Sequence, residues 1–222
     1  MKKFISKNNV FLVADPKSVI QMKMKDVNLL EKVYMVLDVN NVDNLAKLSK
    51  KLLNLSKKCY KFNESIKISL LVKSNGNEVL QNDVIQCATA ALCRSKKERI
   101  EFIYNAVCNY LDEEFVKNNY CEFKNDICKA KRNCKGNVTM GCCHKFKNFL
   151  KNKTVVCPYL KDTKCSAECI TCKLFTCNVI KKRFKLKDIP LIKVYFDPIQ
   201  KFIIKSSYFT KKEVIINRLL MW

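Results

Sequence analysis

Ten cysteines crowd into a short stretch of this chain, and their spacing is typical of metal ligands. The sequence has 14 cysteines, of which ten fall within residues 121–177, and its only histidine lies among them. The candidate ligands are Cys121, Cys128, Cys134, Cys142, Cys143, Cys157, Cys165, Cys169, Cys172, Cys177 and His144. Thiolates on short loops suit Zn²⁺ or iron–sulfur clusters, because one backbone turn can present two ligands to one centre. The stretch is therefore predicted to be a metal site.

Two features of the spacing narrow the kind of centre. Adjacent cysteines such as Cys142 and Cys143 seldom bind one ion together, so the doublet favours two centres or a polynuclear cluster. The spacing Cys165-x3-Cys169-x2-Cys172 matches that of a radical-SAM cluster. Such a motif opens a barrel of ~200 residues, whereas only 50 residues follow Cys172. The chain is therefore not predicted to be a radical-SAM enzyme.

The order of the cysteines also carries a family resemblance. The elements are Gly141-Cys142-Cys143, Cys157-Pro158-Tyr159-Leu160, Lys164-Cys165-Ser166 and Cys172-Lys173-Leu174-Phe175. Over residues 134–177 this string resembles the CxxCxxCC-type cysteine-cluster family, whose domains are described as chelating zinc or iron. It is also similar to the iron–sulfur segment of flagellin lysine-N-methylases. The resemblance implies that five thiols are ligands, namely Cys142, Cys143, Cys157, Cys165 and Cys172.

The resemblance and the single histidine slightly favour a 4Fe–4S cluster, with zinc as the alternative. Structural zinc sites often use histidine beside cysteine, and only His144 is available here. An iron–sulfur centre would allow a second function, that of a small redox or maturation protein. The resemblance alone suggests a third, a fragment similar to a lysine methylase.

A basic segment follows the cysteines. Lys181-Lys182-Arg183-Phe184-Lys185-Leu186-Lys187 holds five cations and one aromatic ring in seven residues. One interpretation is a nucleic-acid interface, with the cations on phosphates and Phe184 stacked on a base. The other is an amphipathic strand or a helix end that turns Phe184 and Leu186 into the core. The sequence leaves both interpretations open.

The overall charge favours polyanionic partners. The net charge is +23, and residues 117–222 carry 24 Lys and Arg against seven Asp and Glu. Nucleic acid or an acidic protein is therefore the expected partner. The sequence shows no signal peptide and no apolar run of the ~18 residues that a membrane span needs. We expect a reduced, cytoplasmic protein without a membrane partner.

The sequence lacks the common motifs of catalytic side chains and of nucleotide-binding loops. Three glycines scarcely allow a glycine-rich phosphate loop, and no Ser-His-Asp pattern occurs. The acidic triplet Asp112-Glu113-Glu114 is expected to be a solvated helix end. We therefore expect a binding protein rather than an enzyme, with any catalysis confined to the metal.

The elements that position these residues are predicted to give an α+β fold. The 222 residues suit one large domain or two small ones. Residues 1–92 are expected to form a small α/β or α+β unit, and residues 93–117 a connecting helix. Residues 118–222 are expected to form an irregular, metal-stabilised cysteine-rich domain that ends in a mixed segment.

Periodicity locates individual elements. Strands are expected at Val10–Ala14 and Ile66–Val72, helices at Asp43–Lys58 and from about Asn82 to Leu92, and either type at Val27–Leu37. Capping-box patterns at Ser95–Glu98 and Thr210–Glu213 predict two further helices. The cysteines outside the cluster lie among apolar residues and are expected to be core thiols: Cys59, Cys87, Cys93 and Cys108.

Overall fold

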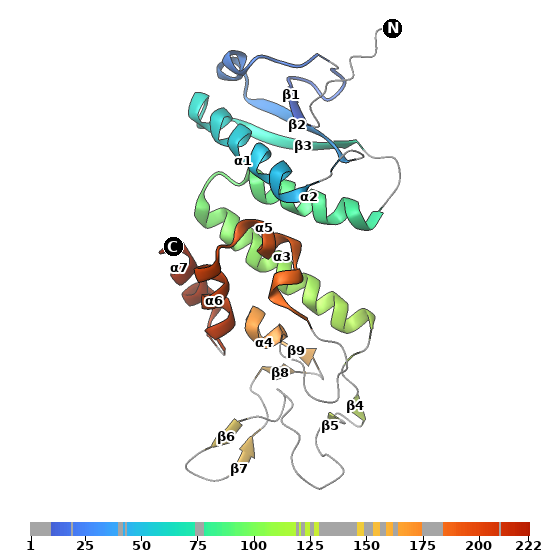
Figure 1. Cartoon of the computed structure of the whole chain (residues 1–222), viewed down its shortest axis with the longest axis vertical. Helices are drawn as coiled ribbons and strands as arrows, with labels where there is room; N and C mark the ends of the chain where they lie inside the picture. Colours follow the sequence, from blue (N-terminus) through green and yellow to red (C-terminus); the bar gives the residue numbers. More distant parts are fainter. Residues whose placement is uncertain are drawn as a thin grey trace. The chain divides into compact units, whose positions relative to one another are not determined.

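The chain folds into two compact units, residues 1–102 and 103–222, in a computed structural model. The structure describes residues 10–18, 20–39, 42, 44–73, 78–118, 120, 123–124, 127–128, 146–148, 153–155, 159–161, 164–174, 184–208 and 210–222. A three-stranded sheet and several helices make up these residues, which confirms the α+β class (Figure 1). None of the helices in these ranges is long and apolar enough to cross a membrane.

A three-stranded sheet forms the centre of the first unit. Strands β1 (Val10–Val13), β2 (Lys32–Asp38) and β3 (Lys67–Lys73) lie in the order β1-β2-β3, the first pair antiparallel and the second parallel. The strands expected at residues 10–14 and 66–72 are confirmed as β1 and β3. The stretch that could have been helix or strand divides into a 3-10 helix, η1 (Met24–Leu29), and strand β2. The parallel pairing requires a crossover, which a helix supplies.

Two helices pack together within this unit. Helix α1 (Leu45–Phe62) begins at Asn44, whose side chain accepts a hydrogen bond from the Lys47 N–H. Helix α2 (Glu78–Leu92) contacts α1, and the Ser56 hydroxyl donates to the Ala91 carbonyl over 2.7 Å. Both helices contain a fully buried thiol, as expected of core cysteines. The apolar stripe in the sequence therefore predicted α1 well.

The long helix α3 (Lys96–Lys117) begins at the expected capping sequence. The Ser95 hydroxyl accepts a hydrogen bond from the Glu98 N–H. The Glu98 carboxylate accepts from the N–H of Arg94, one residue before the position that a standard capping box uses. The division between the two units falls within this helix.

Short hairpins and one short helix follow α3 in the second unit. The pairs are β4 (Phe123–Lys124) with β5 (Ile127–Cys128), β6 (Phe146–Asn148) with β7 (Lys153–Val155), and β8 (Leu160–Lys161) with β9 (Lys164–Cys165). Helix α4 (Ile170–Leu174) comes next. Each pair is a separate two-stranded sheet in the described part of the chain, so none extends the sheet of the first unit.

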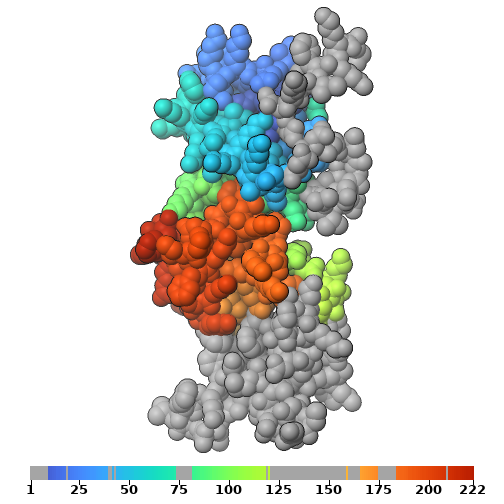
Figure 2. All heavy atoms as spheres, viewed as in Figure 1, coloured from blue at the N-terminus to red at the C-terminus, as the bar shows by residue number. Residues whose placement is uncertain are grey.

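The last part of the second unit is helical, and its atoms form a continuous orange-to-red surface in the space-filling view (Figure 2). Its helices are the 3-10 helix η5 (Leu186–Asp188), α5 (Pro190–Tyr195), α6 (Pro198–Ser206) and α7 (Lys212–Leu220). Asp197 caps α6 in a reciprocal capping box with Gln200. The box expected at Thr210 is wrong, because α7 begins two residues later and lacks a side-chain cap. The Thr210 hydroxyl donates to the Tyr208 carbonyl instead.

Candidate functional site

Two of the predicted ligands, Cys169 and Cys172, come together at the start of α4. They are 2% and 8% exposed, and their spacing of three residues puts both side chains on one side of a helical turn. A hydrogen bond from the Cys172 thiol lowers the pKa of the Cys169 thiol to about 6, assisted by the backbone N–H groups of Cys172 and Thr171. These donors outweigh burial, which acts in the opposite direction. Cys169 is therefore prepared to ionise near neutral pH.

Cys169 also contacts the C-terminal end of α6. Its Sγ lies 3.0 Å from the Ser207 carbonyl oxygen, to which the protonated thiol donates. Two residues along the chain, the Thr171 hydroxyl donates to the Ile204 carbonyl. Carbonyls at a helix C-terminus lack partners within the helix. The Ile204 carbonyl accepts from the Ser207 N–H and from Thr171, and the Ser207 carbonyl accepts from the Cys169 thiol. Ionisation of Cys169 would remove the last of these bonds.

Tyr104 on α3 fixes the backbone just before α4. Its side chain is fully buried, and its hydroxyl donates to the Glu168 carbonyl over 3.3 Å and accepts from the Ile170 N–H over 3.2 Å. Burial raises the pKa of the Tyr104 hydroxyl, and ionised neighbouring thiols would raise it further. The hydroxyl therefore stays neutral and keeps both bonds, which position Cys169 between two residues that Tyr104 holds.

A second link from α3 to α4 runs through an ion pair. The Lys173 ammonium pairs with the Asp112 carboxylate, and the lysine side chain is only 5% exposed. A buried cation needs such a partner, because burial without one is costly. The Asp112 side chain is itself 51% exposed, so the expected solvated acidic helix end is confirmed at this residue, and the ion pair adds a buried lysine as its partner.

Cys108 on α3 is buried, which confirms the prediction of a core thiol, but the sequence analysis did not predict that it lies near α4. Burial raises the pKa of its thiol to about 12; the Lys173 charge opposes this, whereas Asp112 and Cys169 add to it. These electrostatic effects place Cys108 near α4, and the thiol is protonated at neutral pH. The signal was available in the sequence, because Tyr104, Cys108 and Asp112 recur at four-residue steps along one helix face.

The other predicted ligands lie in short strands or outside the described residues. Cys128 and Cys165 lie in strands β5 and β9, of which the backbone is described. Outside the described residues lie Cys121, Cys134, Cys142, Cys143, Cys157, Cys177 and His144. Among the residues that the structure describes, no three Cys, His, Asp or Glu side chains form a group that could hold a metal ion. The described site is therefore a pair of thiols.

The basic segment divides into packed apolar residues and exposed cations. Phe184 stacks on Phe115 with ring centroids 5.6 Å apart and meets Tyr120 edge-on at 5.9 Å. Leu186 is buried, as the core interpretation requires, but it lies in a 3-10 helix rather than a strand. Lys185 and Lys187 are exposed, whereas residues 181–183 (Lys181, Lys182 and Arg183) lie outside the described ranges.

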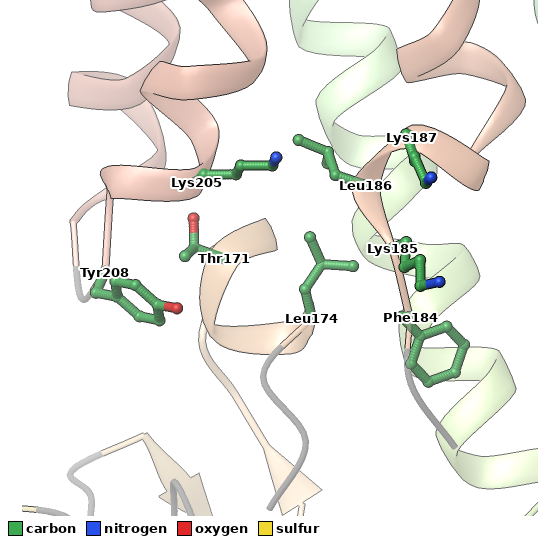
Figure 3. A pocket seen from close by; sticks show the side chains of 8 residues that line it. All are labelled: Thr171, Leu174, Phe184, Lys185, Leu186, Lys187, Lys205 and Tyr208. Carbon is green, nitrogen blue, oxygen red and sulfur yellow. The ribbon is translucent and has the colours of Figure 1, made fainter.

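A pocket of about 490 Å³ connects this basic segment to α4 and α6. Its walls include Lys185 and Lys187 on one side and Lys205 and Tyr208 on the other (Figure 3). Leu174 rises from α4 between these walls, and Lys205 extends from α6 toward Leu186. The pocket therefore combines cations with an apolar floor.

Comparisons with models of known families, with curated proteins and with solved structures found no match. The resemblance to the cysteine-cluster family stays a prediction, and the geometry of the described residues is the basis for a function.

Proposed function

We propose that the chain is a metal-binding protein in which Cys169 and Cys172 supply two ligands of one centre. The observation that supports this proposal is the hydrogen-bonded thiol pair at the start of α4, in which the pKa of Cys169 is lowered to about 6. Metals bind thiolates rather than thiols, so a cysteine that ionises easily gives up little free energy on binding. Cys59 and Cys87, whose pKa values are raised, lack this property.

Further ligands would come from the eight other cysteines of residues 121–177. A structural zinc ion takes four ligands, as does a 4Fe–4S cluster, so the pair is half of a site. The described hairpins between residues 123 and 165 have strands of two or three residues. Isolated two-stranded hairpins are marginally stable in water, and a bound metal would supply the missing free energy. The single histidine favours 4Fe–4S slightly, with zinc as the alternative.

A thiol–disulfide exchange function is the competing interpretation of the pair. Cys-x2-Cys motifs with a low-pKa first cysteine also occur in dithiol oxidoreductases. In exchange, the attacking sulfur must reach a substrate disulfide, whereas Cys169 is 2% exposed and contacts Ser207. Burial thus favours a ligand that remains inside the protein.

Metal analysis of the anaerobically purified full chain tests the proposal. Bound iron with absorbance at about 400 nm would identify an iron–sulfur centre, and a colourless zinc protein would identify the alternative. The double variant Cys169→Ser, Cys172→Ser should lose metal. Cys93→Ser is the matched control, since this cysteine lies outside the cluster and is only partly buried. Metal-free wild-type protein, or unchanged metal content in the double variant, would overturn the proposal.

We further propose that the basic residues of the second unit bind the phosphate groups of nucleic acid. Residues 117–222 hold 24 of the 43 Lys and Arg, and Lys185 and Lys187 are exposed. Binding through phosphates weakens steeply as salt rises, because counterions are released. An affinity for oligonucleotides that does not change with salt would reject this part and leave an acidic protein as the partner to test.

A further inference from the structure

The pocket between α4, α6 and the basic segment indicates which part of a nucleic acid the protein would bind. Lys185 and Lys187 come from the segment before α5, and Lys205 comes from the last turn of α6. All three are exposed, and none forms an ion pair with a carboxylate in the described part of the chain. The acid nearest in the sequence to Lys185 and Lys187 is Asp188, which is also exposed. Three cations around one pocket repel one another, and an anion would relieve this repulsion.

The rest of the pocket suits a planar ring. Tyr208 is 50% exposed at its edge, while Leu174 and Leu186 give an apolar floor. Aromatic side chains stack on bases of any type, since every base has a π face. The volume of about 490 Å³ falls within the ordinary range of small-ligand pockets. Phe184 also lines the pocket, where it stacks on Phe115 and meets Tyr120 edge-on.

Hydrogen bonds from residues 169–171 reach the wall of this pocket. Thr171 bonds to the carbonyl of Ile204, the residue before Lys205. Cys169 bonds to the carbonyl of Ser207, the residue before Tyr208. The Thr171 hydrogen bond therefore positions the backbone before Lys205, and the Cys169 bond adds to this only while the thiol is protonated.

We propose that the pocket binds one nucleotide unit, with its phosphate on Lys185, Lys187 and Lys205 and its base against Tyr208. The proposal rests on the phosphate contact proposed above and names the site of that contact. The nucleotide is either one unit of a single-stranded nucleic acid or a free nucleotide, and the two sources share this chemistry.

Fluorescence anisotropy of the full chain with labelled oligothymidylate tests the cations. Lys205→Gln should weaken binding by about five-fold or more and reduce the salt dependence by roughly one phosphate contact. Lys193→Gln is the matched control, because it removes one charge from an exposed residue of α5 that does not line the pocket. Equal weakening by both changes would overturn the pocket but leave the phosphate contact standing. Absence of salt-dependent binding in the wild type would remove both.

The ring is tested at Tyr208. Tyr208→Ala should weaken binding by at least about five-fold, as loss of one base stack does, and Tyr208→Phe should restore it to within about two-fold. Competition then distinguishes the sources: thymidine monophosphate that competes as well as the oligonucleotide identifies a free nucleotide, and weaker competition identifies a strand. Inorganic phosphate that competes as well as the monophosphate, or an alanine variant that binds normally, would overturn the assignment of the base.

Discussion

Cys87 in the first unit and Cys169 in the second are both buried, yet the pKa values of their thiols move in opposite directions. Burial raises the pKa of Cys87 to about 12, with the Asp83 carboxylate adding to the effect. Cys169 receives hydrogen bonds from the Cys172 thiol and from backbone N–H groups, which lower its pKa to about 6. Burial alone therefore does not distinguish a core thiol from a reactive one; the donors around the sulfur do.

The two units also differ in the contacts that stabilise them. Both units bury apolar side chains, but the described part of the second also joins its short elements through polar contacts at buried positions. Tyr104, Lys173 and Thr171 make these contacts. The first unit should thus depend mainly on apolar packing, and the second on its polar contacts and the proposed metal as well as on apolar packing.

Metal removal should have the largest effect and should separate the units. Structural Zn²⁺ binding is worth about 10–16 kcal/mol in small metal-binding peptides. If the proposal holds, a chelator should make the second unit sensitive to protease while the first unit stays resistant. Limited proteolysis with mass analysis of the fragments measures this. Cleavage that begins equally in both units, or no change in either, would contradict the comparison.

A core substitution should do the reverse. Leu52 on α1 is fully buried, so Leu52→Ala should destabilise the first unit by about 2–5 kcal/mol. The metal content should remain that of the wild type. Urea unfolding followed by circular dichroism gives the loss of stability, and elemental analysis gives the metal. Loss of metal in this variant would show that the units are not independent.

Removing the Tyr104 hydroxyl should have a smaller effect. Tyr104→Phe leaves the Ile170 N–H without its acceptor and the Glu168 carbonyl without its donor, and it should cost about 1–3 kcal/mol. Tyr120→Phe is the control, because it keeps the ring that packs on Phe115. Urea midpoints of the two variants check the difference. Equal midpoints would mean that the Tyr104 hydroxyl does not stabilise the start of α4.

The smallest signal is the ionisation of single thiols in metal-free protein. Subtracting the titration of Cys169→Ser from that of the wild type, by thiolate absorbance at about 240 nm, should give a midpoint near pH 6. The same subtraction with Cys87→Ser should give a midpoint near pH 12. Two midpoints near the ordinary thiol value of 9.0 would remove the contrast between the two cysteines.

The same shifts predict opposite effects on stability. The folded state holds Cys169 ionised between about pH 6 and 9, where an unfolded thiol is protonated. Its contribution is complete above pH 9 and is lost as the pH falls to about 6. The contribution of Cys87 is complete below pH 9 and is lost as the pH rises toward 12. Urea unfolding of each variant against the wild type across this range measures both trends.

Local patterns predicted much of the fold. The strand at Val10, helix α1 and the start of α3 at Ser95 follow from apolar periodicity and from a side chain that caps its own helix. Thr210 failed as a cap because its hydroxyl bonds back to Tyr208, a choice that a sequence pattern does not reveal. The Cys169-x2-Cys172 pair was also predicted, since its spacing is local.

The sequence by itself determined most elements of the first unit apart from residues 27–37, the concentration of charge in the second half, and the adjacency of Cys169 and Cys172. Only the tertiary structure decided that Cys108 and Asp112 face α4, that Lys173 is buried, and that Lys205 and Tyr208 share a pocket with Lys187. The physical reason is distance along the chain. Capping and helical spacing act over three or four residues, whereas the ion pair of a buried lysine and a pocket wall depend on elements tens of residues apart.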